Sequence, residues 1–287
     1  MSLRLLVLPL LLLLAACEVL DRDEGRLSLS LTDAPVEDVD SVEVTVDAVI
    51  LTHEDGDTET LELEPPQRVD LLQQRNGSRA SLLSDVPVRS GRYDRIRLRL
   101  LESATSTESS VLPRGTTQRQ PLFVPEDAEA GLILNGAFVV PDGEAAAFTI
   151  DLDLRQSLRT PAGGAQAWTL RPVLRIVEDA RAGSVAGSVG TARATAAGCV
   201  PAVYAFAGRD TEPDDIDGLE AEPLTEATVE RGADGVYRYQ LAFLPAGDYS
   251  LAYTCGAGLD EPDSSQTLSF VRGLATVRAQ ATTTANF

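Results

Sequence analysis

The chain has 287 residues, enough for two medium-sized domains or one large β domain. Its formal net charge is −20, and it contains no lysine, so every basic side chain except His53 is an arginine. This acidic excess argues against nucleic acid and anionic lipid head groups as partners, because their phosphates would be repelled. Apolar residues are dispersed along the chain, so most of it is expected to fold.

The first 16 residues have the pattern of a secretory signal peptide: Arg4, then an apolar run from Leu5 to Leu14, then small residues. The run is shorter than the ~20 residues that a membrane-spanning helix needs. The run Leu14-Ala15-Ala16-Cys17 resembles the lipobox of bacterial lipoproteins, and this resemblance implies that Cys17 is acylated and becomes the new N-terminus. Residues 17–25 then form a lipidated tether, and Glu18 favours delivery to the outer membrane. We therefore expect an outer-membrane lipid anchor in the cell envelope, with the chain facing the periplasm or the cell surface.

Alternation of apolar and polar residues predicts β-strands over residues 26–178. Leu27, Leu29 and Leu31 alternate with polar residues, and 54–57 form a turn typical of a hairpin. The predicted strands are 26–31, 40–52, 68–72, 93–101, 131–140, 146–154 and 168–177. Two polar stretches, 103–120 and 161–166, are expected to be exposed loops. This spacing indicates a β-sandwich.

The alternation breaks near 179–183 and then resumes, which predicts a second domain over residues 183–287. Its predicted strands are 185–189, 202–207, 235–244, 247–254, 267–271 and 275–281. The predicted fold class is therefore all-β, with two Ig-like or prealbumin-like β-sandwiches in tandem after the signal peptide.

The cysteines divide into one lipidated residue and one predicted disulfide. With Cys17 assigned to lipid, Cys199 and Cys255 remain in an oxidising compartment, where a pair tends to form a bridge. Neither has a neighbouring cysteine at metal-site spacing, and His53 is the one histidine, so a zinc site is not expected. His53 itself is predicted to be an exposed turn residue.

Acidic residues supply the candidate chemical sites. Asp33, Asp38 and Asp40 crowd one turn together with Glu37, and such a density of oxygen ligands could hold Ca²⁺; a turn role is the alternative. Asp151 and Asp153 lie two residues apart on one predicted strand face, a spacing that could suit a hydrolase, an ion ligand or only an exposed acidic face. No other cofactor is expected.

Two resemblances add to this picture. Leu31-Thr32-Asp33-Ala34-Pro35, Tyr93-Asp94-Arg95-Ile96-Arg97-Leu98 and Leu170-Arg171-Pro172-Val173 resemble the bacterial lipoprotein domain known as domain of unknown function 4382, over most of residues 26–178. Leu244-Pro245-Ala246-Gly247-Asp248-Tyr249 resembles the strand-connecting turn of the prealbumin-like, carboxypeptidase-regulatory-like sandwich, which implies that Tyr249 packs inward and implies no catalysis.

These observations predict a lipid-anchored envelope protein that acts as a non-catalytic binding or structural module. The membrane, through the lipid, and an unidentified envelope protein or glycan are the expected partners. A calcium-dependent adhesion or glycan-binding module is the alternative, and a hydrolase that uses Asp151 and Asp153 is the third candidate.

Overall fold

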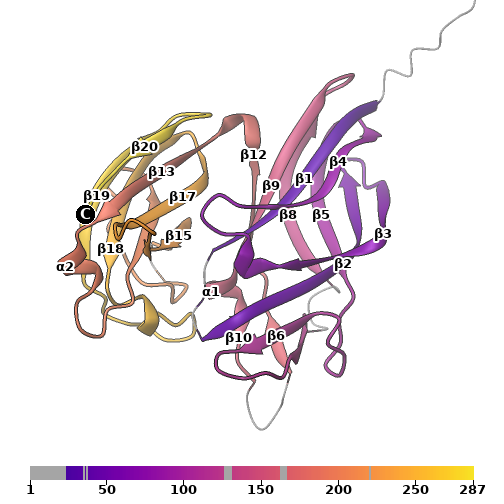
Figure 1. Cartoon of the computed structure of the whole chain (residues 1–287). Coiled ribbons are helices and arrows are strands. Elements are labelled where there is room, and N and C mark those ends of the chain that lie inside the picture. The colour runs from indigo at the N-terminus through magenta and orange to yellow at the C-terminus, as the bar shows by residue number, and fades with distance from the viewer. Residues whose placement is uncertain (1–23, 35, 37, 126–130, 162–166, 220) are drawn as a thin grey trace, which may run out of the picture.

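Two β-sandwiches lie side by side in the structure (Figure 1). The computed structural model describes residues 24–34, 36, 38–125, 131–161, 167–219 and 221–287. Strands dominate both sandwiches, so the predicted all-β fold class is confirmed. Within these ranges, no helix has the length and apolar composition needed to cross a membrane. The predicted signal peptide and Cys17 lie outside the described residues.

The first sheet of the N-terminal sandwich (residues 24–178) has the strand order β12-β9-β1-β4. Its strands are β1 (Glu24–Ala34), β4 (Ala80–Arg89), β9 (Ala145–Asp153) and β12 (Leu174–Glu178). Strand β1 pairs antiparallel with β4 and parallel with β9. Its alternation buries Leu27, Leu29 and Leu31 completely. The parallel pairing places the C-terminal ends of β1 and β9 together, with Asp33 opposite Leu152.

The second sheet follows the order β10-β11-β7-β6-β2-β5-β8, with β3 also paired to β2. Its strands are β2 (Val39–His53), β3 (Thr58–Asp70), β5 (Gly91–Leu100), β6 (Ser110–Pro113), β7 (Gln120–Phe123), β8 (Leu132–Val140), β10 (Leu158–Arg159) and β11 (Trp168–Leu170). β2 and β3 form the predicted hairpin, closed by Gly56 at a φ of 90°. The two sheets enclose one apolar core, in which Tyr93 stacks on Phe138 with ring centroids 5.0 Å apart.

The C-terminal sandwich (residues 182–287) combines a sheet of order β16-β17-β13-β20 with one of order β15-β14-β18-β19. Its strands are β13 (Ala182–Val189), β14 (Ala202–Ala207), β15 (Thr225–Thr228), β16 (Glu230–Arg231), β17 (Tyr237–Pro245), β18 (Gly247–Thr254), β19 (Phe270–Val277) and β20 (Thr282–Thr284). Tyr249 is 4% exposed and packs inward. The predicted Cys199–Cys255 disulfide is confirmed, with Cα atoms 4.5 Å apart.

Helices are short and lie at the ends of strands. They are η1 (Leu71–Gln73), α1 (Leu154–Ser157), η2 (Asp179–Arg181), α2 (Thr191–Ala194) and η3 (Ala257–Leu259). The chain passes from β12 through η2 directly into β13, and so from one sandwich into the other.

Several predicted elements differ from the structure. The stretch 103–120, predicted to be a loop, contains β6. The predicted strand 168–177 is interrupted between β11 and β12 around Pro172, which has no amide hydrogen for a ladder bond. The predicted strands 267–271 and 275–281 overlap one continuous strand, β19. Strand β4 has no regular alternation and contains Pro87, and it was not predicted.

Candidate functional site

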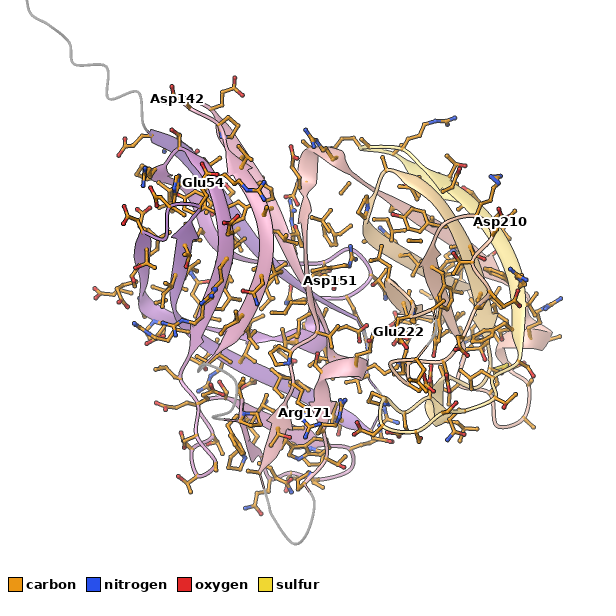
Figure 2. All side chains as sticks on the ribbon, turned by 180° about the vertical axis from the view of Figure 1, so that it is seen from behind. Glu54, Asp142, Asp151, Arg171, Asp210 and Glu222 are labelled. Carbon is orange, nitrogen blue, oxygen red and sulfur yellow. A yellow bond between two sulfur atoms is a disulfide. The ribbon has the colours of Figure 1, made fainter. Side chains whose placement is uncertain are left out.

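Three aspartates gather where β1 and β9 end, at the junction between the two sandwiches. The parallel pairing of β1 with β9 brings Asp33 close to Asp151 and Asp153, and all three side chains are buried. Asp153 caps α1 by accepting hydrogen bonds from the backbone N–H of Gln156 at 2.9 Å and from its side-chain amide at 2.8 Å. Asp33 accepts from the backbone N–H of Leu154 at 3.2 Å. Figure 2 shows Asp151 at this junction.

Burial and like charge both act on these carboxyl groups. Burial raises the pKa of Asp33 well above its usual range, and the charges of Asp151 and Asp153 add to the shift. Burial also raises the pKa of Asp153, against the hydrogen bonds from Gln156 that lower it. Within the described chain, the second carboxylate oxygen of Asp33 has no hydrogen-bond partner. The prediction that Asp151 and Asp153 lie on an exposed strand face is wrong, because both side chains are buried where the C-terminal sandwich covers this face.

Arg155 crosses the junction from the N-terminal to the C-terminal sandwich. Its guanidinium pairs with the carboxylate of Glu226 on β15, and its Nη1 donates to the backbone oxygen of Ala257 at 2.5 Å. The two charged side chains are 4% and 1% exposed. Arg155 lies on α1 rather than continuing the strand, so it points across the junction. Removing one member of such a pair leaves an uncompensated buried charge, so each charge depends on the other.

A second arginine binds Asp151, one of the two aspartates of the hydrolase alternative. Arg175, on β12, pairs through Nη2 with Asp151 at 2.5 Å, and its Nη1 donates to the backbone oxygen of Phe243 at 2.7 Å. The hydroxyl of Thr225 also donates to Asp151, at 3.4 Å. Phe243 and Thr225 belong to the C-terminal sandwich, so this cluster is a further link between the two sandwiches.

Exposed contacts surround these buried links. Arg75 pairs with Glu230 at 3.1 Å. Arg159 pairs with Asp263 at 2.8 Å, and Arg79 lies over the ring of Phe243, 5.6 Å from its centroid. Ion pairs at an exposed rim add little stability individually.

A groove lies along the same junction, between the turn at 75–78 and the sheet that contains β13 and β17. It consists of two hollows of about 630 and 360 Å³, and both are lined by Gln240. Arg231 and Asn286 line the larger hollow, and Asn76 borders it from the N-terminal sandwich. Gly77 has a φ of 88°, and a Cβ there would come within 2.9 Å of the Gln240 side chain. We call this feature the junction groove.

One group of carboxylates in the described part of the chain could hold a metal ion. Asp214, Asp215 and Asp217 lie between β14 and β15, and their ligand atoms are all within 4.8 Å of one another. Glu222 lies nearby on the same segment. Its pKa is raised to about 7 by burial, and the charges of the three aspartates contribute to the shift.

The structure does not bring Asp33, Asp38 and Asp40 together as a comparable group within the described residues. Asp33 is buried at the junction, while Asp38 and Asp40 are exposed. Asp40 accepts from the backbone N–H of Gly115 at 3.3 Å. Glu37, which belongs to the same turn, lies outside the described residues, so calcium at this turn stays a prediction.

Two aromatic side chains, His53 and Trp168, are buried. His53 is 8% exposed and packs edge-on against Tyr93, so its predicted exposure is wrong. Strand β2 extends to His53, so the ring lies beside Tyr93 instead of in an exposed turn. Trp168 is 7% exposed, and its indole N–H donates to the side-chain oxygen of Gln120 at 2.7 Å.

Comparison with known proteins identifies one family. A family model described as a domain of unknown function (DUF4382) matches residues 24–172. No curated protein matches the chain.

Solved structures give weak similarities. The minor pilin of Streptococcus agalactiae has 12% identity and a TM-score of 0.20, over 91% of this chain and 94% of that one. A putative adhesin of Bacteroides ovatus has 11% identity and a TM-score of 0.22, over 88% and 82%. A leucine-rich repeat protein of Bacteroides thetaiotaomicron has 17% identity and a TM-score of 0.23, and the match covers 92% of this chain but 26% of that protein. TM-scores this low carry no argument about function.

Replacing Arg155 by Met is expected to lower the free energy of unfolding by about 3–5 kcal/mol, because Glu226 is left as an unpaired buried charge. Urea denaturation measures this loss. The exposed pair of Arg92 and Asp94 supplies the control, and Arg92→Met should cost no more than about 1 kcal/mol. Equal losses for the two variants would contradict the role assigned to Arg155.

Replacing Asp33 by Asn tests its raised pKa and keeps an acceptor oxygen for the N–H of Leu154. In the unfolded chain the pKa of Asp is ~3.9. Folding raises it, so the folded state binds more protons above that pH, and wild-type stability falls as pH rises through this window. Asn does not titrate. The stability of Asp33→Asn relative to wild type should therefore increase as the pH rises above about 4. Urea denaturation at a series of pH values measures this difference, and a difference that does not change with pH would contradict the prediction.

Proposed function

Because the chain belongs to the DUF4382 family, whose description assigns no activity, we propose a function from the geometry of the junction. We propose a lipid-anchored protein of the bacterial cell envelope that acts as a non-catalytic binding or structural module. The main support for this proposal is the buried ion pair of Arg155 and Glu226, because it links the two sandwiches and holds them in one arrangement.

The environment of the paired aspartates supports a non-catalytic role. Asp151 is bound by Arg175 and Thr225, and Asp153 caps α1. A carboxylate that exchanges protons with a substrate must come within hydrogen-bond reach of it. These two side chains are 5% and 8% exposed, and their hydrogen bonds go to the protein itself.

The junction groove is the surface that we assign to binding. Its larger hollow of about 630 Å³ has the size of a small-ligand site, and both sandwiches contribute to its walls. Arg231, Asn76 and Gln240 present guanidinium and amide groups, and Tyr239 adds an aromatic ring. Such donors match hydroxyl, carboxylate and peptide groups, so a glycan or an extended segment of an envelope protein fits this chemistry.

The position of β1 relates the groove to the proposed anchor. The strand begins at Glu24, seven residues after Cys17, and ends at the junction with Ala34. A strand of this length spans about 35 Å at ~3.3 Å per residue. A lipid on Cys17 would therefore anchor the protein to the membrane near the start of β1, at Glu24, and the junction groove would lie away from the membrane, near the other end of the strand.

A photo-reactive p-benzoylphenylalanine in place of Arg231 should crosslink the partner in intact cells, because this exposed residue lines the groove. The chain has no lysine, so amine-reactive reagents are unsuitable. Immunoblotting should show one discrete adduct. The same substitution at Thr116, exposed between β6 and β7, serves as the control and should give none. Absence of an adduct at Arg231, or identical adducts at both positions, would count against the groove.

Replacing Cys17 by Ser should abolish acylation and move the protein from the outer-membrane fraction to the soluble envelope fraction, because no acyl chain can then hold it. Labelling with radioactive palmitate followed by density-gradient fractionation measures both effects. Equal labelling and sedimentation of wild type and variant would show that Cys17 is not the anchor.

A further inference from the structure

The segment between β14 and β15 concentrates acidic side chains on the C-terminal sandwich. Asp214, Asp215 and Asp217 place ligand oxygens within 4.8 Å of one another, and Glu222 interacts electrostatically with all three. Figure 2 shows Glu222 on the C-terminal sandwich, on the same segment as the more distant Asp210. In the described structure, no ion pair with an arginine compensates these four carboxylates.

Buried hydrogen bonds fix the shape of this segment. The backbone N–H of Ile216 donates to Asp260 at 3.1 Å, and Asp260 also accepts from the hydroxyl of Tyr204 at 2.6 Å. Both Asp260 and Tyr204 are buried. Gly218 follows with a φ of 82°, which reverses the chain toward Glu222. The acidic side chains are therefore arranged by the core of the sandwich.

Two carboxylate oxygens at this place are buried with no partner. Asp215 is 1% exposed, and its Oδ2 accepts from the backbone N–H of Gln266, but its Oδ1 has no hydrogen-bond partner in the described structure. The two carboxylate oxygens of Glu222 differ in the same way. One accepts from the N–H of Gly218 at 2.7 Å, and the buried Oε2 has no hydrogen-bond partner among the described residues. Burying an unsatisfied carboxylate oxygen is costly unless a cation or a donor binds it.

We propose that Asp214, Asp215, Asp217 and Glu222 bind a calcium ion. Asp214, Asp215 and Asp217 offer hard carboxylate oxygens, which Ca²⁺ prefers, and neither His nor Cys contributes to their group. Glu222, bound to the backbone N–H of Gly218, offers a further carboxylate beside them. Ca²⁺ takes six to eight oxygens in flexible geometry, so backbone oxygens and water can complete its coordination around an irregular segment. Mg²⁺ demands a near-octahedral arrangement and gives up its water reluctantly. The proposal does not depend on the proposed function.

The site also has a consequence for the junction. Asp260, which holds Ile216, belongs to the segment directly after η3, and η3 contains the Ala257 that Arg155 binds. An ion that neutralises the acidic segment would thus stabilise the surroundings of an interdomain contact.

Isothermal titration calorimetry and thermal unfolding of the full chain, purified in detergent and stripped with EDTA, test the proposal. Wild type should bind one equivalent of Ca²⁺, with a rise in melting temperature that EDTA reverses. Asp217→Asn, at a half-buried position, should weaken Ca²⁺ binding at least tenfold. Asp214→Asn should also weaken Ca²⁺ binding at least tenfold, so that a folding defect in one variant alone cannot explain the loss. Asp210→Asn, on the same segment but outside the group, is the matched control and should bind like wild type.

Other outcomes would overturn the assignment. No heat and no thermal shift with millimolar Ca²⁺ would show that the group binds no calcium. Unchanged affinity in both Asp217→Asn and Asp214→Asn would place any bound ion elsewhere, and a loss on Asp38→Asn instead would move it to the turn predicted from the sequence. A Mg²⁺ titration as tight as the Ca²⁺ titration would reject the choice of metal.

Discussion

The desolvated pair of Arg155 and Glu226 is the interaction on which the arrangement of the two sandwiches depends. A buried ion pair contributes little net stability compared with apolar residues, but it penalises every arrangement that separates its members. Sliding one sandwich over the other would leave two bare charges in a low-dielectric interface. Arg175 and Asp151 add to this constraint, because the backbone oxygen of Phe243 and the hydroxyl of Thr225 bind them from the second sandwich. The junction groove keeps its shape for the same reason.

Much of the fold could be predicted from the sequence, because alternation is a local property. Strands such as β1 and β18 follow directly from apolar residues at every second position. β4 could not be found in this way, since its alternation is broken where Asp85 takes a positive φ and Pro87 follows. The pairing of strands is non-local, so nothing in the sequence placed β1 beside β9.

The candidate sites show the same limit. The sequence identified Asp33, Asp151 and Asp153 as notable acids, but assigned them to a calcium turn and to an exposed strand face. Only the parallel pairing of β1 with β9 and the covering second sandwich reveal that they share one buried junction. The group at Asp214 lacks the spacing of a known calcium loop. Its distinguishing signal, an unsatisfied buried oxygen of Asp215, exists only in three dimensions.

The place of β1 inside its sheet has a mechanical consequence. β1 is hydrogen-bonded on both sides, to β4 and to β9, and the chain enters it at Glu24 from the side of the proposed anchor. Ladder hydrogen bonds lie across the strands, so a pull along β1 strains two whole ladders in shear at once instead of opening them bond by bond. A chain tethered at that end can resist force between the membrane and whatever its second sandwich holds.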